Sequence, residues 1–399
     1  MNKPLTGIRV LDLTHMLSGP YGAMILADLG AETIKVEPLQ GEGTRRLLAE
    51  DPDYSLEGMG AYYLTLNRNK KSVALNLKSE AGLAVFYDLV READVVISNF
   101  GAGVPERLKI DYAHLEKVNP RIITCTVTGF GSDGPKPNRP AFDQVAQATG
   151  GGMSITGTDP KHPVRSGIPI GDLGGGMFAV MGIQAALLER ARSGRGQHVD
   201  ISMLDCQISM LNYMATMYFL SGRDPYPIGN AHFVHVPYNT YPTSDGFIVV
   251  AVITDNFWAN LKSVVNCPEF DDPAYDGQPG RWRDRDMINQ KLVEVFSTDT
   301  SANWLERLEA RRIPCAPVNR LSQALDDVQV RHRNMVVELR HPNGQSTFGP
   351  GNPIKLSRNN QESFSESPTL GQHTDDVLRE LLGYDDCRLA TLRQEQAVA

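Results

Sequence analysis

Short hydrophobic runs alternate with amphipathic segments along the first half of this 399-residue chain. The runs predict strands over 8–14, 33–37, 73–77, 95–98, 122–128 and 198–202. Amphipathic spacing predicts one helix after Gly19-Pro20, ended by Gly30, and another over 80–91. Because strands that alternate with helices form parallel sheets covered on both faces, we expect an α/β domain.

The segment 167–194 combines glycine and proline with a long apolar stretch. No charged side chain occurs over 177–188, which predicts a helix that is buried on most sides. Arg190 and Arg192 suit the C-terminal end of this helix, and Gly194 suits its stop. Asp172 is then the last side chain able to bond at the mouth of the helix before a run of glycines.

Asp172 has two interpretations that this segment alone leaves open. It can be the N-cap of the helix, because Asp is among the best N-cap residues. It can instead be a carboxylate nucleophile, since a helix N-terminus stabilises an anion and backbone N–H groups can hold a developing oxyanion. The three glycines at 174–176 exceed what a cap needs and would let another molecule approach the backbone closely.

The second half of the chain changes character near residue 224. A methionine-bearing helix is predicted over 203–217, where methionines at this spacing are more typical of a core or interface than of a binding site. The sequence Asp-Pro-Tyr-Pro at 224–227 breaks this helix. Beyond it we expect a hairpin over 241–250 with an Asp245-Gly246 turn, and helices over 258–265 and 287–296.

A final helix is predicted with Thr374 as its N-cap and Gly383 after its last turn. We therefore divide the chain into a large domain over 1–224, a small domain over 225–322, and a linker with a C-terminal return to the large domain over 323–399.

Composition excludes several classes of protein. The hydrophobic content of 41% and charged content of 22% are ordinary for a globular protein, and the net charge of −8 argues against nucleic-acid binding. No apolar run approaches the ~20 residues of a membrane span, and residues 1–5 lack a signal-peptide core, so we expect a cytoplasmic protein. Five scattered cysteines without a CxxC pair indicate neither a zinc site nor a disulfide framework.

Basic residues gather in the first half of the chain, and in an acidic protein they suggest a polyanionic ligand such as a phosphate-rich cofactor. They are Arg45, Arg46, Arg68, Lys70, Lys71, Lys78, Arg107, Arg139 and Arg165, each of which alone is more typical of solvated surface. Glu37 ends a strand where a dinucleotide-binding fold places its ribose acid, but the turn at 17–22 is not GxGxxG, so NAD is disfavoured. No P-loop is present to indicate ATP.

Two further groups of residues are candidates for binding. Asn99, Phe100 and Gly101 come just after a strand, at the edge where open α/β sheets bind ligands. His232 and His235 are spaced i, i+3, but no acidic or cysteine partner lies nearby in sequence, which favours polar loop residues over metal ligands.

Several motifs, each weak alone, form a specific set in their order along the chain. They are GIRVLDL at 7–13, GP at 19–20, ADLGAETIKVE at 27–37, NRNKKS at 67–72, NF at 99–100, GFG at 129–131, GDLGG at 171–175, CAPVN at 315–319 and LGQHT at 370–374. With this set, which covers nearly the whole chain, the protein resembles the class III coenzyme A transferases. This CaiB/BaiF-type family includes formyl-CoA, carnitine and bile-acid CoA transferases and the related α-methylacyl-CoA racemases.

The resemblance implies a Rossmann-like parallel-sheet large domain that holds both termini, a smaller α+β domain, and an interlinked homodimer of ring-like subunits. It implies that Asp172 is the nucleophile, that coenzyme A and acyl-CoA are substrates, and that no cofactor or metal is bound permanently. Family contacts to CoA match His15, Leu17, Ser18, Leu75, Asn76, Lys78, Asn99, Phe100, Gly101, Arg107, Ala141, Phe142 and Asp143.

The function implied by this resemblance is CoA transfer from an acyl-CoA donor to a carboxylic acid acceptor, through aspartyl anhydride and aspartyl-CoA thioester intermediates. The runner-up is an acyl-CoA racemase, but the segment 139–152 lacks the histidine that this branch needs as an acid/base residue. A non-catalytic CoA- or nucleotide-binding protein is a third reading, which the presence of Asp172 in its motif disfavours.

Sequence differences from the formyl-CoA:oxalate branch narrow the choice of acceptor acid. The segment 229–237 lacks that branch's glycine run, and Phe142 and Leu17 replace its tyrosine and its glutamine. We therefore expect a short dicarboxylic acid larger than oxalate. His232 and His235 could pair with the second carboxylate when protonated.

Overall fold

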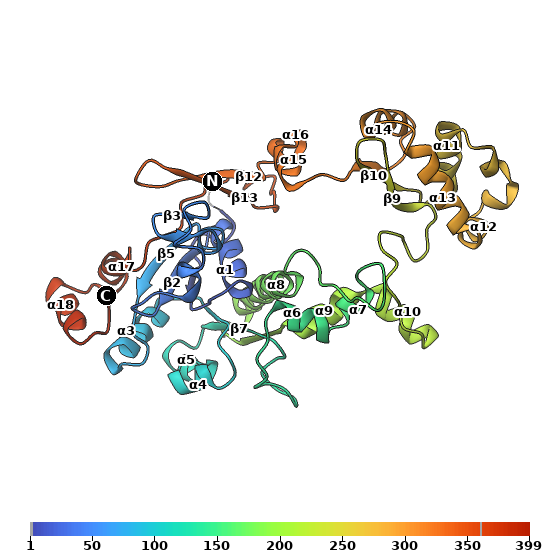
Figure 1. The fold of residues 1–399 in the computed structure, drawn as a ribbon. Coiled ribbons are helices and arrows are strands. Elements are labelled where there is room, and N and C mark those ends of the chain that lie inside the picture. The colour runs from blue at the N-terminus through green and yellow to red at the C-terminus, as the bar shows by residue number, and fades with distance from the viewer. Residues whose placement is uncertain (1–2, 360) are drawn as a thin grey trace. The chain divides into compact units, whose positions relative to one another are not determined.

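The computed structural model describes residues 3–359 and 361–399, and the chain separates into two compact units (Figure 1). The larger unit consists of Met1–Gly152, Arg165–Gly222 and Gln329–Ala399. The smaller unit consists of Met153–Val164 and Arg223–Val328. Hydrophobic clusters fill both faces of the main sheet in the larger unit, and a separate cluster forms the core of the smaller one.

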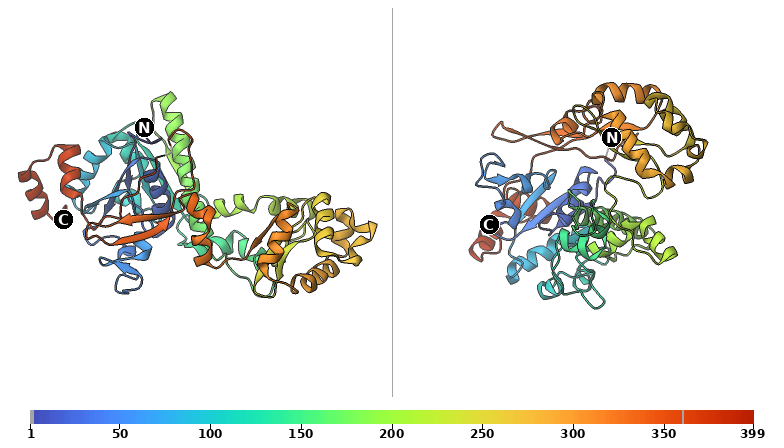
Figure 2. Two further views of the ribbon diagram at one scale, coloured as in Figure 1. Left: turned by 90° about the horizontal axis from the view of Figure 1, so that it is seen from above. Right: turned by 45° about the vertical axis from the view of Figure 1, so that its right-hand side comes forward.

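A six-stranded sheet in the order β5-β2-β1-β6-β7-β8 is the centre of the larger unit (Figure 2). Every neighbouring pair of strands is parallel, which confirms the predicted α/β architecture. The strands are β1 (Arg9–Asp12), β2 (Glu32–Glu37), β5 (Lys70–Ala74), β6 (Val95–Ser98), β7 (Ile123–Thr128) and β8 (His198–Ser202). The order reverses between β1 and β6, and open α/β sheets bind ligands at such a switch point.

Helices cover both faces of this sheet, as expected for buried parallel strands. One face packs against α3 (Glu80–Arg91), α5 (Tyr112–Val118), α17 (Thr374–Leu382) and α18 (Asp386–Gln394). The other face packs against α1 (Ser18–Asp28), α6 (Asp143–Thr149), α8 (Ile170–Ser193) and α9 (Met203–Leu211). Shorter elements complete the unit: η1 (Gly43–Arg46), β3 (Ser55–Leu56), β4 (Met59–Gly60), α2 (Ala61–Leu64), α4 (Val104–Leu108), α10 (Tyr213–Ser221), β12 (Val336–Arg340) and β13 (Ser346–Pro350).

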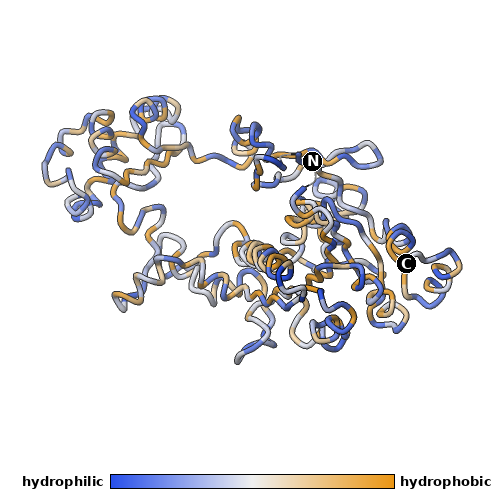
Figure 3. Tube along the Cα trace, turned by 180° about the vertical axis from the view of Figure 1, so that it is seen from behind, coloured by the Kyte–Doolittle hydropathy of each residue, from blue (hydrophilic) through white to orange (hydrophobic). Residues whose placement is uncertain are grey.

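The long helix α8 is less buried than its apolar composition predicts. Met181 is 51% exposed and Leu188 is 69% exposed, because only one side of α8 packs on the sheet and on α1. Hydrophobic residues are spread along the chain of both units (Figure 3). Among the described residues, α8 alone is long and apolar enough to cross a membrane by length and composition, a test that the core helix of a globular unit also passes. The helix ends at Gly194 with φ +75°, as predicted.

Three other predicted elements differ from the observed ones for identifiable reasons. The strand predicted over 73–77 is β5 at Lys70–Ala74, since its first lysine is buried and hides the hydrophobic pattern. The helix predicted over 203–217 is two helices, divided at Asn212 with φ +50°. Thr374 begins α17 instead of capping it, because its hydroxyl oxygen accepts the N–H of Ala74 at 3.1 Å.

The smaller unit is built on a three-stranded antiparallel sheet in the order β11-β10-β9. The hairpin forms as predicted, but Asp245-Gly246 is not the centre of its turn: the Thr243 N–H donates to the Gly246 carbonyl at 2.9 Å, so Gly246 closes the turn. The elements are β9 (Tyr238–Pro242), β10 (Phe247–Ala251), α11 (Asp255–Val265), η2 (Pro268–Asp271), η3 (Pro273–Tyr275), α12 (Gln278–Arg283), α13 (Arg285–Phe296), α14 (Ser301–Ala310), β11 (Cys315–Pro317) and α15 (Leu321–Asp326). Two short helices lie where the chain passes between units, α7 (Gly152–Ile155) and α16 (Val328–His332).

Candidate active site

A cavity of about 300 Å³ opens in the larger unit where the loops after β1, β6 and β7 meet the first turn of α8. It lies at the switch point of the sheet, which is the usual place of a ligand site in an open α/β fold. The residues that line it are His15, Met16, Ser18, Asn99, Phe100, Gly101, Ala102, Val127, Thr128, Gly129, Pro137, Asn138, Arg139, Pro140, Ala141, Phe142, Asp172 and Met203.

Asp172 is the third residue of α8, so the interpretation of this residue as the N-cap is wrong. Pro169 occupies the N-cap position, and its side chain accepts no hydrogen bond. The carboxylate of Asp143 instead accepts the N–H of Gly171 at 2.8 Å and that of Asp172 at 3.3 Å. Because a distant residue caps the helix, the carboxylate of Asp172 is left to face the cavity.

The surroundings of Asp172 disfavour its charged form. Burial, and then the charge of Asp143, raise the pKa of Asp172 to about 6. Such a carboxylate is mostly ionised at neutral pH but more basic than an exposed one, and a shift of this kind in a cavity is typical of a catalytic group. The pKa of the Tyr62 phenol is raised by burial and then by Asp172 and Asp143. Tyr62 is therefore a neighbour of the site that we did not predict, because nothing in its local sequence marks it.

The three glycines that follow Asp172 serve helix packing. A Cβ at Gly175 would lie 2.5 Å from the Ser18 hydroxyl, and one at Gly176 would lie 2.6 Å from the Ser18 carbonyl oxygen. A Cβ at Gly174 would meet the end of the Met210 side chain at 2.7 Å. The expectation that another molecule approaches the backbone here is wrong, since the glycines are buried and α1 makes the close approach.

The loop after β1 is held against the loop after β6. The side chain of Asn99 accepts the N–H of His15 at 2.9 Å and donates to its carbonyl oxygen at 2.7 Å. The His15 and Phe100 rings lie with centroids 5.7 Å apart. Ser18, at the start of α1, donates its hydroxyl to the backbone carbonyl of Asp172 at 2.8 Å. The strand order thus joins residues that are far apart in the sequence into one wall.

The structure brings together only part of the predicted CoA-contact set. His15, Ser18, Asn99, Phe100, Gly101, Ala141 and Phe142 line the cavity with Asp172. Leu17 lines a neighbouring apolar pocket, and Asp143 lies behind the cavity as the cap of α8. Leu75 is buried in the core, Asn76 donates to the Gln396 carbonyl at 3.2 Å, and Lys78 and Arg107 are exposed outside the lining.

Four of the nine basic residues are held in ion pairs, whereas Arg139 lines the cavity with Asp172. Arg45 is buried in an ion pair with Glu37, Arg68 with Asp28, and Lys70 with Asp12, at 2.7, 2.7 and 2.8 Å. Lys71 pairs with Glu32 at 2.7 Å. These partners are distant in sequence and could not be anticipated. Because the Glu37 carboxylate is bonded to Arg45, it is not placed to bind a ribose.

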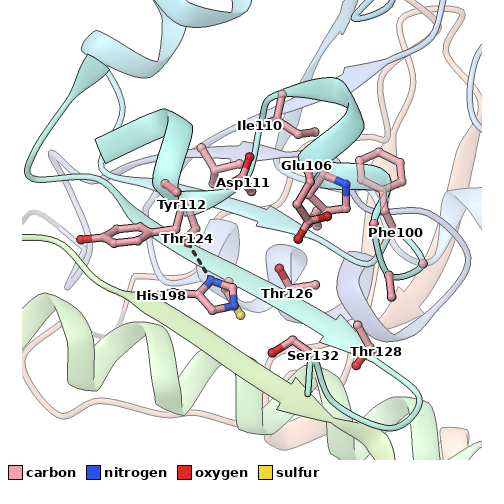
Figure 4. Close-up of a pocket in the computed structure, with 18 residues that line it drawn as sticks. Phe100, Glu106, Ile110, Asp111, Tyr112, Thr124, Thr126, Thr128, Ser132 and His198 are labelled. Atoms are coloured by element: carbon pink, nitrogen blue, oxygen red, sulfur yellow. Dashed lines mark hydrogen bonds between the residues drawn. The ribbon is translucent and has the colours of Figure 1, made fainter. Parts of the chain in front are cut away.

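A second cavity, of about 450 Å³, adjoins the first (Figure 4). The two share Phe100 and Thr128, and the second is lined by hydroxyl side chains along β7 and by His198, whose ring nitrogen lies 2.8 Å from the Thr124 hydroxyl. None of the described residues that line it is Lys or Arg, but the guanidinium of Arg107 lies beside the lining residue Gly103. Nowhere in the described ranges do three or more His, Cys, Asp or Glu side chains form a group suited to a metal ion.

Comparison with known proteins decides the family. The model of CoA-transferase family III matches residues 5–374. The chain belongs to this family. The class III CoA-transferase is 36% identical to the succinyl-CoA:glutarate CoA-transferase of Mus musculus, over 96% of the chain and 88% of that protein. It is also 36% identical to the acetyl-CoA:oxalate CoA-transferase of Acetobacter aceti, over 89% of both chains.

The fold of the CoA-transferase agrees with a solved structure of the same family. A CaiB/BaiF family protein from Brucella suis superposes with a TM-score of 0.85 at 34% identity, covering 96% of this chain and 100% of that one. The expected resemblance and the expected enzyme class are therefore confirmed.

Proposed function

We propose that this class III CoA-transferase moves CoA from an acyl-CoA to a short dicarboxylic acid larger than oxalate, with Asp172 as the nucleophile. The observation that carries the proposal is the placement of the Asp172 carboxylate in the cavity at the switch point, with a pKa of about 6. The carboxylate lies at a helix N-terminus, and its burial disfavours the charged form. Both features suit a carboxylate that must form and release covalent bonds.

The proposed first half-reaction forms two covalent intermediates. A carboxylate oxygen of Asp172 attacks the thioester carbonyl carbon, the C–S bond breaks, and CoA leaves as the thiolate with a mixed anhydride behind it. The thiolate then attacks the aspartyl carbonyl of this anhydride, which releases the donor as a carboxylate and leaves an aspartyl-CoA thioester. Each step exchanges one activated acyl bond for another, so covalent catalysis replaces one difficult displacement by easier ones.

The second half-reaction repeats these steps with the acceptor. The acceptor carboxylate attacks the aspartyl-CoA thioester, expels the thiolate and forms a second anhydride on Asp172. The thiolate attacks the acceptor carbonyl of this anhydride, which gives the new acyl-CoA and restores the Asp172 carboxylate. No water enters, and no proton is gained or lost overall.

Covalent trapping tests the nucleophile. Incubation of the wild-type enzyme with succinyl-CoA should add CoA at Asp172, and hydroxylamine should convert this adduct to a hydroxamate there. Asp172→Asn should fold, bind CoA and lose transfer almost completely, since a neutral amide cannot form the anhydride. An adduct on another carboxylate, or near-normal turnover by Asp172→Asn, would refute the mechanism.

The acceptor class is supported by the relatives and by a histidine pair in the smaller unit. The His232 and His235 rings lie 4.8 Å apart, and the His232 Nδ1 accepts the N–H groups of Val234 and His235 at 3.0 and 3.2 Å. This places the His232 proton on Nε2. The Nδ1 of His235 is buried and has no partner in the part of the chain that is described.

The loop that carries these histidines is held rigidly by α12. Gln278 donates to the Val234 carbonyl at 2.8 Å, and the buried Arg281 donates to the Val236 carbonyl at 3.0 Å. Burial and then His235 lower the pKa of His232, which disfavours the protonated form that the expected pairing with a carboxylate needs. We nevertheless propose that the pair binds a carboxylate of the acceptor.

A panel of acids with a matched control tests this assignment. His232→Ala and His235→Ala should each raise the KM of glutarate at least tenfold, with a smaller effect on the acyl-CoA. His162→Ala is the control, since His162 is an exposed imidazole of the same unit that pairs with Asp159. Unchanged acceptor KM values in both variants would remove the histidine role, and preferred turnover of monocarboxylates or oxalate would refute the acceptor class.

We also propose that the enzyme acts as an interlinked homodimer. Large apolar side chains are exposed on α8 and α10 of the larger unit: Met181, Leu188, Tyr213, Tyr218, Phe219 and Leu220. Phe219 and Leu220 are 80% and 84% exposed, which is typical of a surface that another chain covers. A stable folded monomer in light scattering at nanomolar dilution would contradict the dimer.

A further inference from the structure

Two lysines are buried beneath the loop that leads from β1 into α1. Lys35 on β2 is fully buried, and Lys70 on β5 is 4% exposed. Removing an ammonium group from water is unfavourable unless it gains specific partners. Burial lowers the pKa of Lys70 to about 8, while Asp12 acts in the opposite direction, so the group stays mainly cationic at neutral pH. Their partners therefore show what the two lysines do.

The two ammonium groups hold opposite ends of the same loop. Lys35 donates to the carbonyl oxygen of Thr14 at 2.8 Å, just after β1. Lys70 donates to the carbonyl oxygen of Pro20 at 3.1 Å, in the first turn of α1. Lys70 also bonds to the carboxylate of Asp12 at 2.8 Å, and that carboxylate accepts the N–H of Thr14 at 2.9 Å.

Charge neutralisation alone does not explain this arrangement. The charge of Lys35 acts on the buried carboxylates of Asp12, Glu37 and Glu42, but the Asp12 carboxylate is bonded to Lys70. The ammonium group of Lys35 itself donates to the backbone carbonyl of Thr14. Glu37, the acid at the end of the same strand as Lys35, is paired with Arg45 at 2.7 Å. Lys35 therefore contributes charge to this acidic cluster and, in addition, binds the backbone of the loop.

The loop between the two anchors has a conformation that needs support. Met16 has φ +61°, in the left-handed region that a side chain other than glycine rarely adopts. Such residues persist only when the surrounding structure holds them in place. His15, Met16 and Ser18 all line the cavity that contains Asp172, so the strained turn aims the loop at the candidate site.

We propose that Lys35 and Lys70 are positioning residues that fix the Thr14–Pro20 loop for acyl-CoA binding. This inference rests on the proposed function, in which the cavity above the loop takes the acyl-CoA. Neither lysine touches the substrate. Each acts through the backbone carbonyl that it binds.

Calorimetric titration with CoA, together with steady-state kinetics, tests the inference on the full-length enzyme. Lys35→Met should weaken CoA binding at least tenfold and raise the KM of the acyl-CoA, with the acceptor KM changed less than twofold. For Lys70 the suitable variant is Asp12→Asn with Lys70→Met, because it leaves no carboxylate buried alone. It should weaken CoA binding to a similar extent.

Lys71→Met is the matched control. It removes the next lysine on the same strand, whose side chain is 36% exposed and pairs with Glu32 at the surface. It should leave CoA binding within twofold of the wild type. Hydrogen exchange supplies a second measurement: in Lys35→Met, the amides of residues 14–19 should exchange faster, while those of β6 and β7 stay protected.

The outcomes separate the inference from the function on which it rests. Folded Lys35→Met and double variants that bind CoA as tightly as the wild type would overturn the inference while the proposed function stands. Unchanged exchange over residues 14–19 would also overturn it. A wild-type enzyme that binds no CoA would overturn both.

Discussion

The carboxylate of Asp143 caps the helix that carries Asp172. Its Oδ1 accepts the N–H of Gly171 at 2.8 Å and that of Asp172 at 3.3 Å, while its other oxygen accepts the Gln147 amide at 2.7 Å. The same contact that fixes the start of α8 thus places a negative charge beside Asp172. After burial, this charge is the second cause of the raised pKa of Asp172.

Asp143→Asn separates the cap from the charge. The amide oxygen of Asn can still accept the N–H of Gly171, so α8 should keep its start. Loss of the negative charge should lower the pKa of Asp172 from about 6, because a like charge no longer opposes ionisation. The pH profile of covalent adduct formation, measured in a single turnover, should therefore move to lower pH. A profile that stays in place or moves upward would contradict the electrostatic role of Asp143.

Asp172→Asn should stabilise the fold at high pH. The pKa of Asp172 is raised from 3.8 to about 6, so folding opposes its ionisation. This penalty is fully present above pH 6, falls as pH drops through the window from 6 to 4, and is absent below it. At about 1.4 kcal/mol per pKa unit, the variant should gain roughly 2–3 kcal/mol in free energy of unfolding at pH 8 and almost nothing at pH 3.5.

Urea unfolding at the two pH values measures this difference. Since both measurements use the same pair of proteins, effects of the substitution that do not depend on pH cancel in the comparison. A difference in unfolding free energy between variant and wild type that is no more favourable to the variant at pH 8 than at pH 3.5 would show that Asp172 is not held in a destabilising environment.

Gly176→Ala should disrupt the contact between α8 and α1. The new Cβ would lie 2.6 Å from the Ser18 carbonyl oxygen and 3.2 Å from the Gly22 nitrogen, and neither backbone can move without shifting α1. We expect a loss of about 1–3 kcal/mol in free energy of unfolding. Gly174→Ala is the control, because its Cβ would meet only the flexible end of Met210 at 2.7 Å. Equal losses in the two variants would contradict this packing role.

Asn99→Ala should weaken CoA binding by loosening the loop after β1. The substitution removes both hydrogen bonds that join Asn99 to the backbone of His15, each worth about 1 kcal/mol, so the Kd of CoA should rise about tenfold. Asn119→Ala removes three hydrogen bonds away from the cavity: two to the Val90 and Ala93 carbonyls and one accepted from the Arg121 N–H. It should lower the melting temperature without changing the Kd, and a similar rise in Kd for both would refute a local effect.

The regular elements of the larger unit were largely predictable because their signals are local. The helix over Glu80–Arg91 and the strands Val95–Ser98 and His198–Ser202 agree with the predicted bounds. Hydrophobic spacing and turn glycines act over a few residues, so a linear pattern is enough to find them. The strand that begins at Lys70 was misplaced because its signal is not local. Lys70 can be buried there only because it pairs with Asp12, which lies on another strand.

The candidate site was predictable only where a motif or a strand end marked it. Asp172 and Asn99 were found in this way, and both line the cavity. Tyr62 was missed, and the ion pairs of Arg45, Arg68 and Lys70 were not predicted, because ion pairing is decided by neighbours in space. Asp12 and Lys70 are 58 positions apart, and Arg68 pairs with an acid 40 positions away.

The sequence by itself determined the family, the parallel sheet, and the place of Asp172 at the start of a long apolar helix. Tertiary structure alone decided that Asp143, 29 positions away, caps this helix and leaves the Asp172 carboxylate to the cavity. Tertiary structure also decided that the glycines serve the contact with α1 and that Lys35 and Lys70 hold a loop. The reason is physical: periodicity and turn preference are short-range properties, whereas burial, charge pairing and capping depend on which distant segments the folded chain brings into contact.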